Sequence, residues 1–275
     1  MKPRGHGSAD LKMPDREPPL SKSATDVTRR TLLIGAAGLI SLPTAAIAAS
    51  TTSAQLGAVA FDAFTIFDAR SITALVQGFW GASGTKLMAQ WTGKLFGYTW
   101  LETAAGRYSG FEAIADAALR QTAEALALPL STLQRETLTG QYRKLDVWPD
   151  VVPTLTRLRT AGLRLALLSN LSDDLLRTNM TRNGLDQILE QPLSTDRVQR
   201  FKPAGEAYAL GEKAFDIPRS QIGFAAYAGW DAVGAQWFGY PTCWVNRAGQ
   251  SPETLGDGIS FVTNDMTCVV QLAGL

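Results

Sequence analysis

Short apolar runs alternate with amphipathic segments along most of this chain. The predicted strands are residues 58–61, 163–168, 222–226 and 242–246. Their nearly continuous apolar character is typical of strands buried on both faces of a parallel sheet. Apolar residues at three- and four-residue spacing predict helices between them, over about 175–180, 206–215 and 232–238. This alternation predicts an α/β fold with a Rossmann-like, doubly wound parallel sheet.

Two further helical regions complete the pattern. One helix is predicted to begin at Pro149, to bury Val152, Leu155 and Leu158, and to end at Gly162. Residues 71–145 have helical spacing throughout, and no strong strand interrupts them. They predict an inserted all-helical cap, so that residues 55–70 and 146–275 would form the α/β core. Such insertions often exclude water from an active site.

Residues 1–48 have the features of an export signal. Residues 1–27 are polar, and Arg29-Arg30 precede an uncharged apolar run from Ile34 to Ala49 that contains the small-residue site Ala46-Ile47-Ala48. This order is typical of a bacterial twin-arginine signal. The alternative is a transmembrane anchor, which needs about 20 apolar residues. We favour cleavage near Ala48 and a periplasmic protein with no stable membrane association.

Composition and charge narrow the chemistry. The 275 residues are 45% apolar and 19% charged, as in an ordinary globular protein. The net charge is +1 and would become −2 without the signal, so nucleic acid is not an expected partner. The only histidine is His6, within the predicted signal. A mature chain without histidine excludes Ser-His-Asp and Cys-His mechanisms and favours covalent catalysis by a carboxylate.

The two cysteines, Cys243 and Cys268, have no metal-binding spacing. They could form one disulfide in an oxidising compartment or remain two buried thiols. We favour buried thiols, because unpaired cysteine is among the most buried residue types.

Polar residues follow several predicted strands. Asp62 ends the first strand, Ser169-Asn170 end the second, Lys202 lies in a loop before Pro203, and Asp231 follows the strand 222–226. In a doubly wound sheet such positions meet at one edge. A lysine there would keep a nucleophilic carboxylate ionised, while hydroxyl and amide donors hold an anionic substrate. A structural Lys202–Asp231 ion pair beside a simple turn is the alternative for each residue taken alone.

Motifs in this order resemble the haloacid dehalogenase superfamily, and more narrowly the L-2-haloacid dehalogenases of type II. The resemblance covers nearly all of residues 57–275. The motifs that carry it are Phe61-Asp62-Ala63-Phe64, Tyr98-Thr99-Trp100-Leu101, Gly106-Arg107-Tyr108 with Phe111, Leu168-Ser169-Asn170, residues 198–203 with Tyr208, Trp230-Asp231, and residues 239–247.

The resemblance implies a core of this superfamily with a helical cap, no cofactor and no metal. Asp62 would displace halide from a short 2-haloalkanoic acid, and water would hydrolyse the aspartyl ester to a 2-hydroxy acid of inverted configuration. The other catalytic residues implied are Lys202, Asp231, Ser169, Asn170 and Thr65. The substrate-binding positions implied are Phe64, Thr92, Phe111, Tyr208 and Trp230. Family members often form homodimers through the cap, which leaves a homodimer open for this chain.

The chain departs from the family pattern at four positions. The usual Gly-Thr after the first aromatic residue is shortened, so that Phe64 is followed directly by Thr65. Thr92 stands where the family has a halide-binding arginine, and Ala226 and Ala228 replace a serine and an asparagine. The loss of a cationic halide acceptor bears on rate, because preorganised donors stabilise developing charge. The indole N–H of Trp91 or Trp230 is our hypothesis for a substitute.

Two other functions remain open from the sequence. The chain could be a hydrolase or phosphatase of this superfamily acting on another small acid. However, superfamily phosphatases carry a second aspartate two residues after the nucleophile, where this chain has Phe64. It could also be a catalytically weakened protein that binds a small carboxylate. The sequence leaves open the preferred halogen, the acid's chain length and the stereospecificity.

Overall fold

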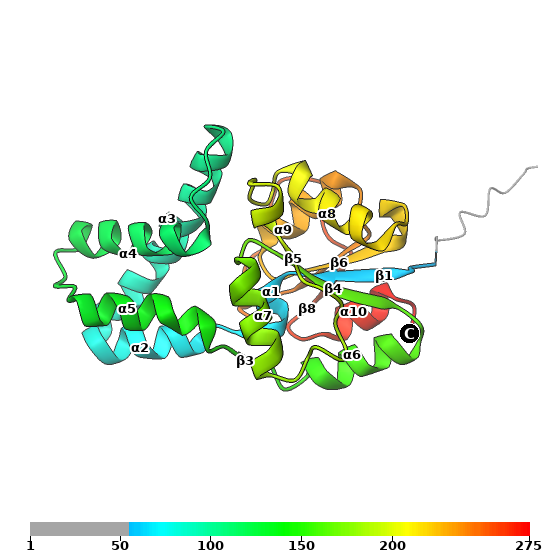
Figure 1. Cartoon of the computed structure of the whole chain (residues 1–275), viewed down its shortest axis with the longest axis horizontal. Coiled ribbons are helices and arrows are strands. Elements are labelled where there is room, and N and C mark those ends of the chain that lie inside the picture. The colour runs from blue at the N-terminus through cyan, green and yellow to red at the C-terminus, as the bar shows by residue number, and fades with distance from the viewer. Residues whose placement is uncertain (1–54) are drawn as a thin grey trace, which may run out of the picture. The chain divides into compact units, whose positions relative to one another are not determined.

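A parallel sheet of six strands forms the centre of the protein (Figure 1). The computed structural model describes residues 55–275, so the predicted export signal lies outside the described residues. The strand order is β5-β4-β1-β6-β7-β8, and every neighbouring pair is parallel. The strands are β1 Ala58–Phe61, β4 Arg164–Ser169, β5 Leu193–Ser194, β6 Ile222–Ala226, β7 Thr242–Val245 and β8 Phe261–Thr263. The predicted doubly wound α/β fold is confirmed.

Helices cover both faces of this sheet. The helices α8 (Gly205–Phe215) and α9 (Gly229–Phe238) lie on one face, and α6 (Val151–Thr160) and α10 (Thr267–Leu272) lie on the other (Figure 1). A further helix, α7 (Asp173–Arg182), follows β4. Alternate residues of β1, β4, β6 and β7 therefore lie on opposite faces of the sheet and enter two different hydrophobic clusters. This two-sided burial explains why strands such as β1, which is completely buried, are apolar at every position.

The helix α6 corrects the sequence prediction in one respect. Its buried residues are Val151, Leu155 and Leu158, whereas Val152 is 40% exposed. A spacing of four and three residues keeps Val151 on the same face as Leu155 and Leu158, and Val152 is rotated by about 100° out of that face. The strands β5 and β8 and the helix α10 lie where the sequence reading predicted no element.

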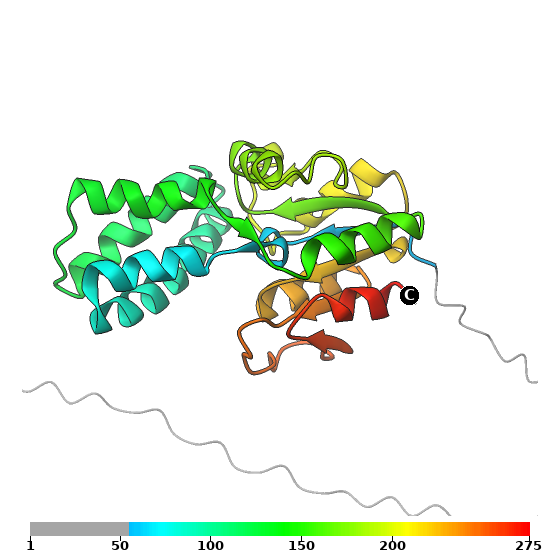
Figure 2. The same ribbon diagram turned by 90° about the horizontal axis from the view of Figure 1, so that it is seen from below.

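In the chain order, a group of four helices lies between β1 and β4, the next strand of the sheet. They are α2 (Arg70–Trp80), α3 (Ala82–Ala104), α4 (Phe111–Ala125) and α5 (Thr132–Gly140), followed by a short 3-10 turn, Gln141–Arg143. We refer to these elements as the cap. Two segments join the cap to the core as an antiparallel pair, β2 (Phe67–Asp68) and β3 (Asp146–Val147). Figure 2 shows the four helices packed together as one group.

The cap contacts the core beside the loop that carries Lys202. Arg200 Nη1 donates to the Thr103 carbonyl at 2.6 Å, and Phe201 N donates to Thr103 Oγ1 at 3.2 Å. The Tyr108 ring stacks on Phe201 with 4.5 Å between ring centroids. These contacts place the end of α3 next to the residue that precedes Lys202.

Both cysteines are buried thiols without a disulfide, as the sequence analysis favoured. Cys243 lies in β7 and Cys268 in α10. Burial raises the pKa of the Cys243 thiol well above its usual value, so this thiol stays protonated. Among residues 55–275, we find no helix with the length and apolar character needed to cross a membrane.

Candidate active site

Asp62 lies at the carboxyl end of β1, the central strand of the sheet at which the strand order reverses. Its backbone N–H donates to the Ala225 carbonyl at 2.9 Å and so continues the pairing with β6. Asp62 is also the N-cap of α1 (Ala63–Ile66), because its Oδ2 accepts a hydrogen bond from Phe64 N at 3.1 Å. The backbone bond to β6 and the N-cap hydrogen bond of α1 together fix the Asp62 carboxylate at the edge where α/β folds bind ligands.

Lys202 lies between two carboxylates. Its Nζ donates to Asp62 Oδ1 at 2.7 Å, to Asp231 Oδ2 at 2.6 Å and to the Leu168 carbonyl at 3.2 Å. The residue is 1% exposed, and these three acceptors use all three ammonium donors. Burial lowers the pKa of Lys202, but Asp231 and Asp62 raise it, and the net pKa is above the usual value. Lys202 is therefore charged at neutral pH.

Asp231 completes this polar cluster from the first turn of α9, not from the loop before the helix, where the sequence analysis placed it. Its Oδ1 accepts a hydrogen bond from the Tyr208 hydroxyl at 2.7 Å. Burial raises the pKa of Asp231 to about 6, with a further contribution from Asp62, while Lys202 and Tyr208 lower it. Asp231 is thus ionised at neutral pH and becomes protonated in mildly acidic solution.

Ser169 and Asn170 lie at the end of β4, beside Asp62. Asn170 Oδ1 accepts from the backbone N–H of Lys202 at 2.8 Å, and Ser169 Oγ accepts from Leu171 N at 3.1 Å. The Nδ2 of Asn170 is buried and has no hydrogen-bond partner among the described residues. A buried donor without a partner is costly. This Nδ2 is therefore suited to an anionic ligand.

Thr65 contacts the backbone of Asp62 and not the open side of the cluster. Its Oγ1 donates to the Asp62 carbonyl at 2.7 Å, and its side chain is completely buried. The hydroxyl therefore fixes the turn that follows the aspartate. The family resemblance implied that Thr65 is a catalytic residue, and in the structure its hydroxyl bonds the backbone of Asp62.

The five positions that the resemblance implied for substrate binding lie in different surroundings. Tyr208 is completely buried beneath Asp231, and Phe111 is buried in the cap with its ring 5.1 Å from that of Tyr142. Phe64 and Trp230 are half-buried. Thr92 is exposed on α3, and its side chain makes no hydrogen bond to another described residue. The polar cluster thus contains one of the five, Tyr208, as a support of Asp231 and not as an open pocket wall.

The hypothesis that Trp91 receives the halide is wrong. Trp91 is completely buried, and its indole N–H donates to the Ala115 carbonyl at 2.9 Å. That donor is already used to join α3 to α4. Trp230 differs, because its indole N–H makes no hydrogen bond to a described residue. Its ring packs 5.2 Å from Phe96 and 5.5 Å from Trp100, both on α3.

Two residues near Asp62 had no assigned role in the sequence analysis. Trp148 Nε1 donates to the Phe64 carbonyl at 3.1 Å, and Arg247 Nη2 donates to the Thr65 carbonyl at 2.9 Å. Arg247 ends the motif at 239–247, which is the one sequence signal that could have pointed to it. Trp148 lies in a linker and gives no such signal.

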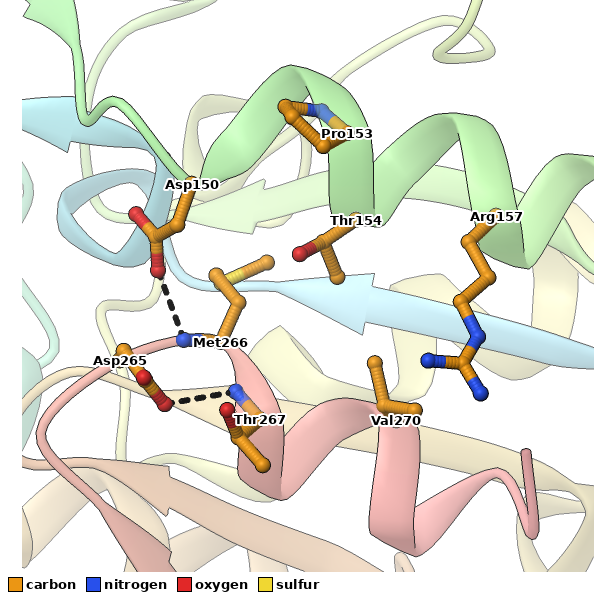
Figure 3. Close-up of a pocket in the computed structure, with 8 residues that line it drawn as sticks. All are labelled: Asp150, Pro153, Thr154, Arg157, Asp265, Met266, Thr267 and Val270. Atoms are coloured by element: carbon orange, nitrogen blue, oxygen red, sulfur yellow. Dashed lines mark hydrogen bonds between the residues drawn. The ribbon is translucent and has the colours of Figure 1, made fainter.

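A surface pocket lies between α6 and α10, away from this cluster (Figure 3). Its lining residues are Asp150, Pro153, Thr154, Arg157, Asp265, Met266, Thr267 and Val270. None of them is a candidate catalytic residue. Asp150 Oδ2 accepts a hydrogen bond from Met266 N at 2.8 Å, so this carboxylate joins the start of α6 to α10.

The carboxylates of the site do not form a group of metal ligands. In the described part of the chain, no three His, Cys, Asp or Glu side chains come together in a way that could hold a metal ion. The Lys202 ammonium lies between Asp62 and Asp231 and forms an ion pair with each of them.

Comparison with known proteins agrees with this geometry. A family model described as haloacid dehalogenase-like hydrolase matches residues 38–237. The chain belongs to this family of hydrolases. It is 36% identical to the (S)-2-haloacid dehalogenase of Pseudomonas sp. (strain YL), over 78% of this chain and 93% of the relative. It is 33% identical to haloacetate dehalogenase H-2 of Moraxella sp. (strain B), over 79% and 98% of the two chains.

Solved structures of this hydrolase family have the same fold. The crystal structure of an L-2-haloacid dehalogenase aligns with a TM-score of 0.77 at 35% identity, covering 80% of this chain and 100% of the other. The L-2-haloacid dehalogenase from Xanthobacter autotrophicus with chloropropionic acid covalently bound aligns with a TM-score of 0.72 at 26% identity, covering 80% and 98%.

Proposed function

We propose that this hydrolase removes halide from short 2-haloalkanoic acids and gives 2-hydroxy acids through an ester on Asp62. The observation that carries the proposal is the buried Lys202 ammonium, bonded at once to Asp62 and Asp231. An ammonium at this distance forms an ion pair with the Asp62 carboxylate and orients it for attack as a nucleophile. The named activities of the relatives, which act on 2-haloacids and haloacetate, support the same substrate class.

The first step is a displacement at the carbon that bears the halogen. A carboxylate oxygen of Asp62 forms a bond to this carbon, and the halogen leaves with the bonding electrons as halide. In the second step, water attacks the Asp62 carboxyl carbon, the ester bond breaks, and the 2-hydroxy acid and a proton are released. Attack at the carboxyl carbon leaves the configuration from the first step unchanged, so one inversion results.

The remaining polar groups have separate tasks in this proposal. The buried Nδ2 of Asn170 and the Ser169 hydroxyl hold the substrate carboxylate, while Thr65 fixes the turn after Asp62. Asp231 keeps Lys202 charged and in position, and Tyr208 supports Asp231. Of the two indoles proposed, Trp230 is the one whose N–H can donate a hydrogen bond to the leaving halide. If Trp230→Phe releases halide as fast as the unchanged chain, that assignment is wrong.

The decisive experiment measures halide release from racemic 2-chloropropionate and from chloroacetate, with EDTA present. The mature chain should release halide from at least one acid, and Asp62→Asn should be slower by on the order of 1,000-fold or more. Release from neither acid, or release that continues in Asp62→Asn, would refute the proposal.

The same experiment separates the two alternatives. A phosphatase of this superfamily would need added magnesium and would act on a phosphate ester. A protein that only binds small carboxylates would keep its affinity for propionate or lactate in Asp62→Asn, whereas an enzyme loses turnover. No feature of the site favours either alternative over dehalogenation.

We also infer that the chain is exported. Arg29-Arg30, the apolar run after them and Ala46-Ile47-Ala48 support a twin-arginine signal that is cleaved near Ala48, with a periplasmic product. The test is cell fractionation with the intact mass of the product. Arg29→Lys with Arg30→Lys should keep the full-length chain inside the cell, and equal export of this double variant would contradict the inference. Whether the product is a homodimer can be read from its mass in solution.

A further inference from the structure

The turn that follows Asp62 has an unusual set of hydrogen-bond partners. Three consecutive backbone carbonyls, those of Phe64, Thr65 and Ile66, accept hydrogen bonds from only two distant residues. Trp148 donates its indole N–H to Phe64 O at 3.1 Å and its backbone N–H to Ile66 O at 3.1 Å. Arg247 Nη2 donates to Thr65 O at 2.9 Å.

The turn needs these donors because α1 is a single helical turn. The last carbonyls of a helix have no partner within the helix. In α1 the Asp62 carbonyl is bonded by Thr65, and the Ala63 carbonyl by Phe67 N. The next three carbonyls have no further helical turn to bond them. Since Thr65 and Ile66 are buried, water cannot easily replace protein donors here.

Arg247 is itself held in place by Asp150. Its guanidinium forms an ion pair with Asp150, at 3.0 Å between Nη2 and Oδ1, and its side chain is 6% exposed. Asp150 is in turn bonded by Met266 N at the pocket of Figure 3. Because Nη1 also donates to Asp150 Oδ2 at 3.2 Å, both terminal nitrogens of the guanidinium hold Asp150 while Nη2 bonds Thr65. A lysine, which has one nitrogen, cannot make this forked contact.

Trp148 is held between the core and the start of the cap. The guanidinium carbon of Arg247 lies 4.5 Å from the centroid of the Trp148 ring, and that of Arg70 lies at the same distance. Arg70 differs in one respect that matters for a test. It is 72% exposed and bonds Asp68, but it contacts none of the three carbonyls.

We propose that Trp148 and Arg247 are positioning residues for the nucleophile: by holding the carbonyls of residues 64–66, they fix the turn whose Phe64 N–H orients Asp62 Oδ2. This inference rests on the proposed function of Asp62. The turn is also one residue shorter than the Gly-Thr pattern of the family that the sequence resembles. A misplacement of about 1 Å at a reacting group can cost on the order of 100-fold in rate.

The test is the rate of halide release from 2-chloropropionate in a single turnover, with enzyme in excess and varied in concentration. The limiting rate constant reports the geometry of the reacting groups. A variant that is only partly folded reaches the same limiting rate constant at a higher total enzyme concentration. This readout therefore distinguishes positioning from a purely structural role.

Trp148→Phe keeps an aromatic ring but removes the indole N–H, and Arg247→Lys keeps the charge but removes the two-pronged contact. We expect each to lower the limiting rate constant by about tenfold. The half-saturating concentration should change by less than about threefold, because Ser169 and Asn170 are untouched. The matched control is Arg70→Lys, which should stay within about twofold of the unchanged chain.

The outcomes separate this inference from the proposed function. If Trp148→Phe and Arg247→Lys keep the limiting rate constant within twofold while Asp62→Asn is inactive, only the positioning role is refuted. An equal loss in Arg70→Lys would also refute it, because that residue contacts none of the carbonyls. If Asp62→Asn is as fast as the unchanged chain, the proposed function fails and the positioning role with it.

Discussion

The core and the cap approach the site with very different side chains. The core contributes Asp62, Lys202, Asp231 and Tyr208, a buried group in which each charge has a partner. The cap contributes an aromatic cluster around Tyr142, whose ring lies 5.1 Å from Phe111 and 6.2 Å from Trp91. This cluster carries no charge, and its one indole N–H is used within the cap.

The difference indicates that the two halves are under different constraints. A buried ion pair tolerates little change, since removing one partner leaves an uncompensated charge. An aromatic cluster tolerates substitutions that preserve volume. Thr92, where the family has an arginine, lies on the cap side. We infer that the chemistry of the core is kept while the groups that receive the leaving halide have diverged.

The largest expected effect comes from breaking the core cluster. Lys202→Met removes the cation that pairs with both Asp62 and Asp231, so Asp62 loses the ion pair that holds it in position. We expect turnover to fall by on the order of 1,000-fold and the free energy of unfolding to fall by about 3–5 kcal/mol. Halide release and urea unfolding check this prediction. Lys213→Met, an exposed lysine of α8, is the control and should change neither.

A smaller effect is expected from the support of Asp231. The hydrogen bond from Tyr208 lowers the pKa of Asp231, so Tyr208→Phe should raise it from about 6. Turnover should fall as pH drops through this value, because protonated Asp231 no longer holds Lys202. In Tyr208→Phe this acid limb should move to higher pH, with turnover at neutral pH several-fold lower. An unmoved acid limb would contradict the role given to Tyr208.

As pH falls, protonation of Asp231 should increase the stability of the folded protein but decrease its turnover. The pKa of Asp231 in the folded state is above its ordinary value of 3.8, so the folded state binds this proton more tightly. This group therefore adds stability as pH falls through about 6 and removes it as pH rises. Circular dichroism across this range should show a folded protein while turnover is lost. The control for Tyr208→Phe is Tyr240→Phe, because Tyr240 donates to the Tyr208 carbonyl and not to Asp231. Turnover of Tyr240→Phe should fall over the same pH range as that of the unchanged chain.

The smallest expected effect concerns the boundary between cap and core. Trp230→Phe keeps the ring against Phe96 but removes the indole N–H, and we expect halide release to slow by a few-fold. Thr92 lies one helical turn before Phe96 on the same face of α3. Thr92→Arg should therefore supply a cation on this side and raise the rate. Trp237→Phe, exposed on α9, should leave the rate unchanged.

Much of the fold could be predicted from local patterns. The strands β1 and β6 match their predicted bounds, because a strand buried on both faces is apolar at every position and ends where the pattern ends. The position of Asp62 followed from the same rule. Short elements such as β5, with two residues, could not be predicted, because they exist only through pairing with a neighbouring strand.

What the sequence by itself determined is the order of the elements, the placement of polar residues at strand ends and the motifs that resemble one hydrolase family. The tertiary structure alone decided how each donor is used. It gave the indole N–H of Trp91 to Ala115 and the guanidinium of Arg247 to the turn after Asp62. The physical reason is that periodicity and turn formation are local, whereas a hydrogen-bond partner across 182 residues depends on how the whole core packs.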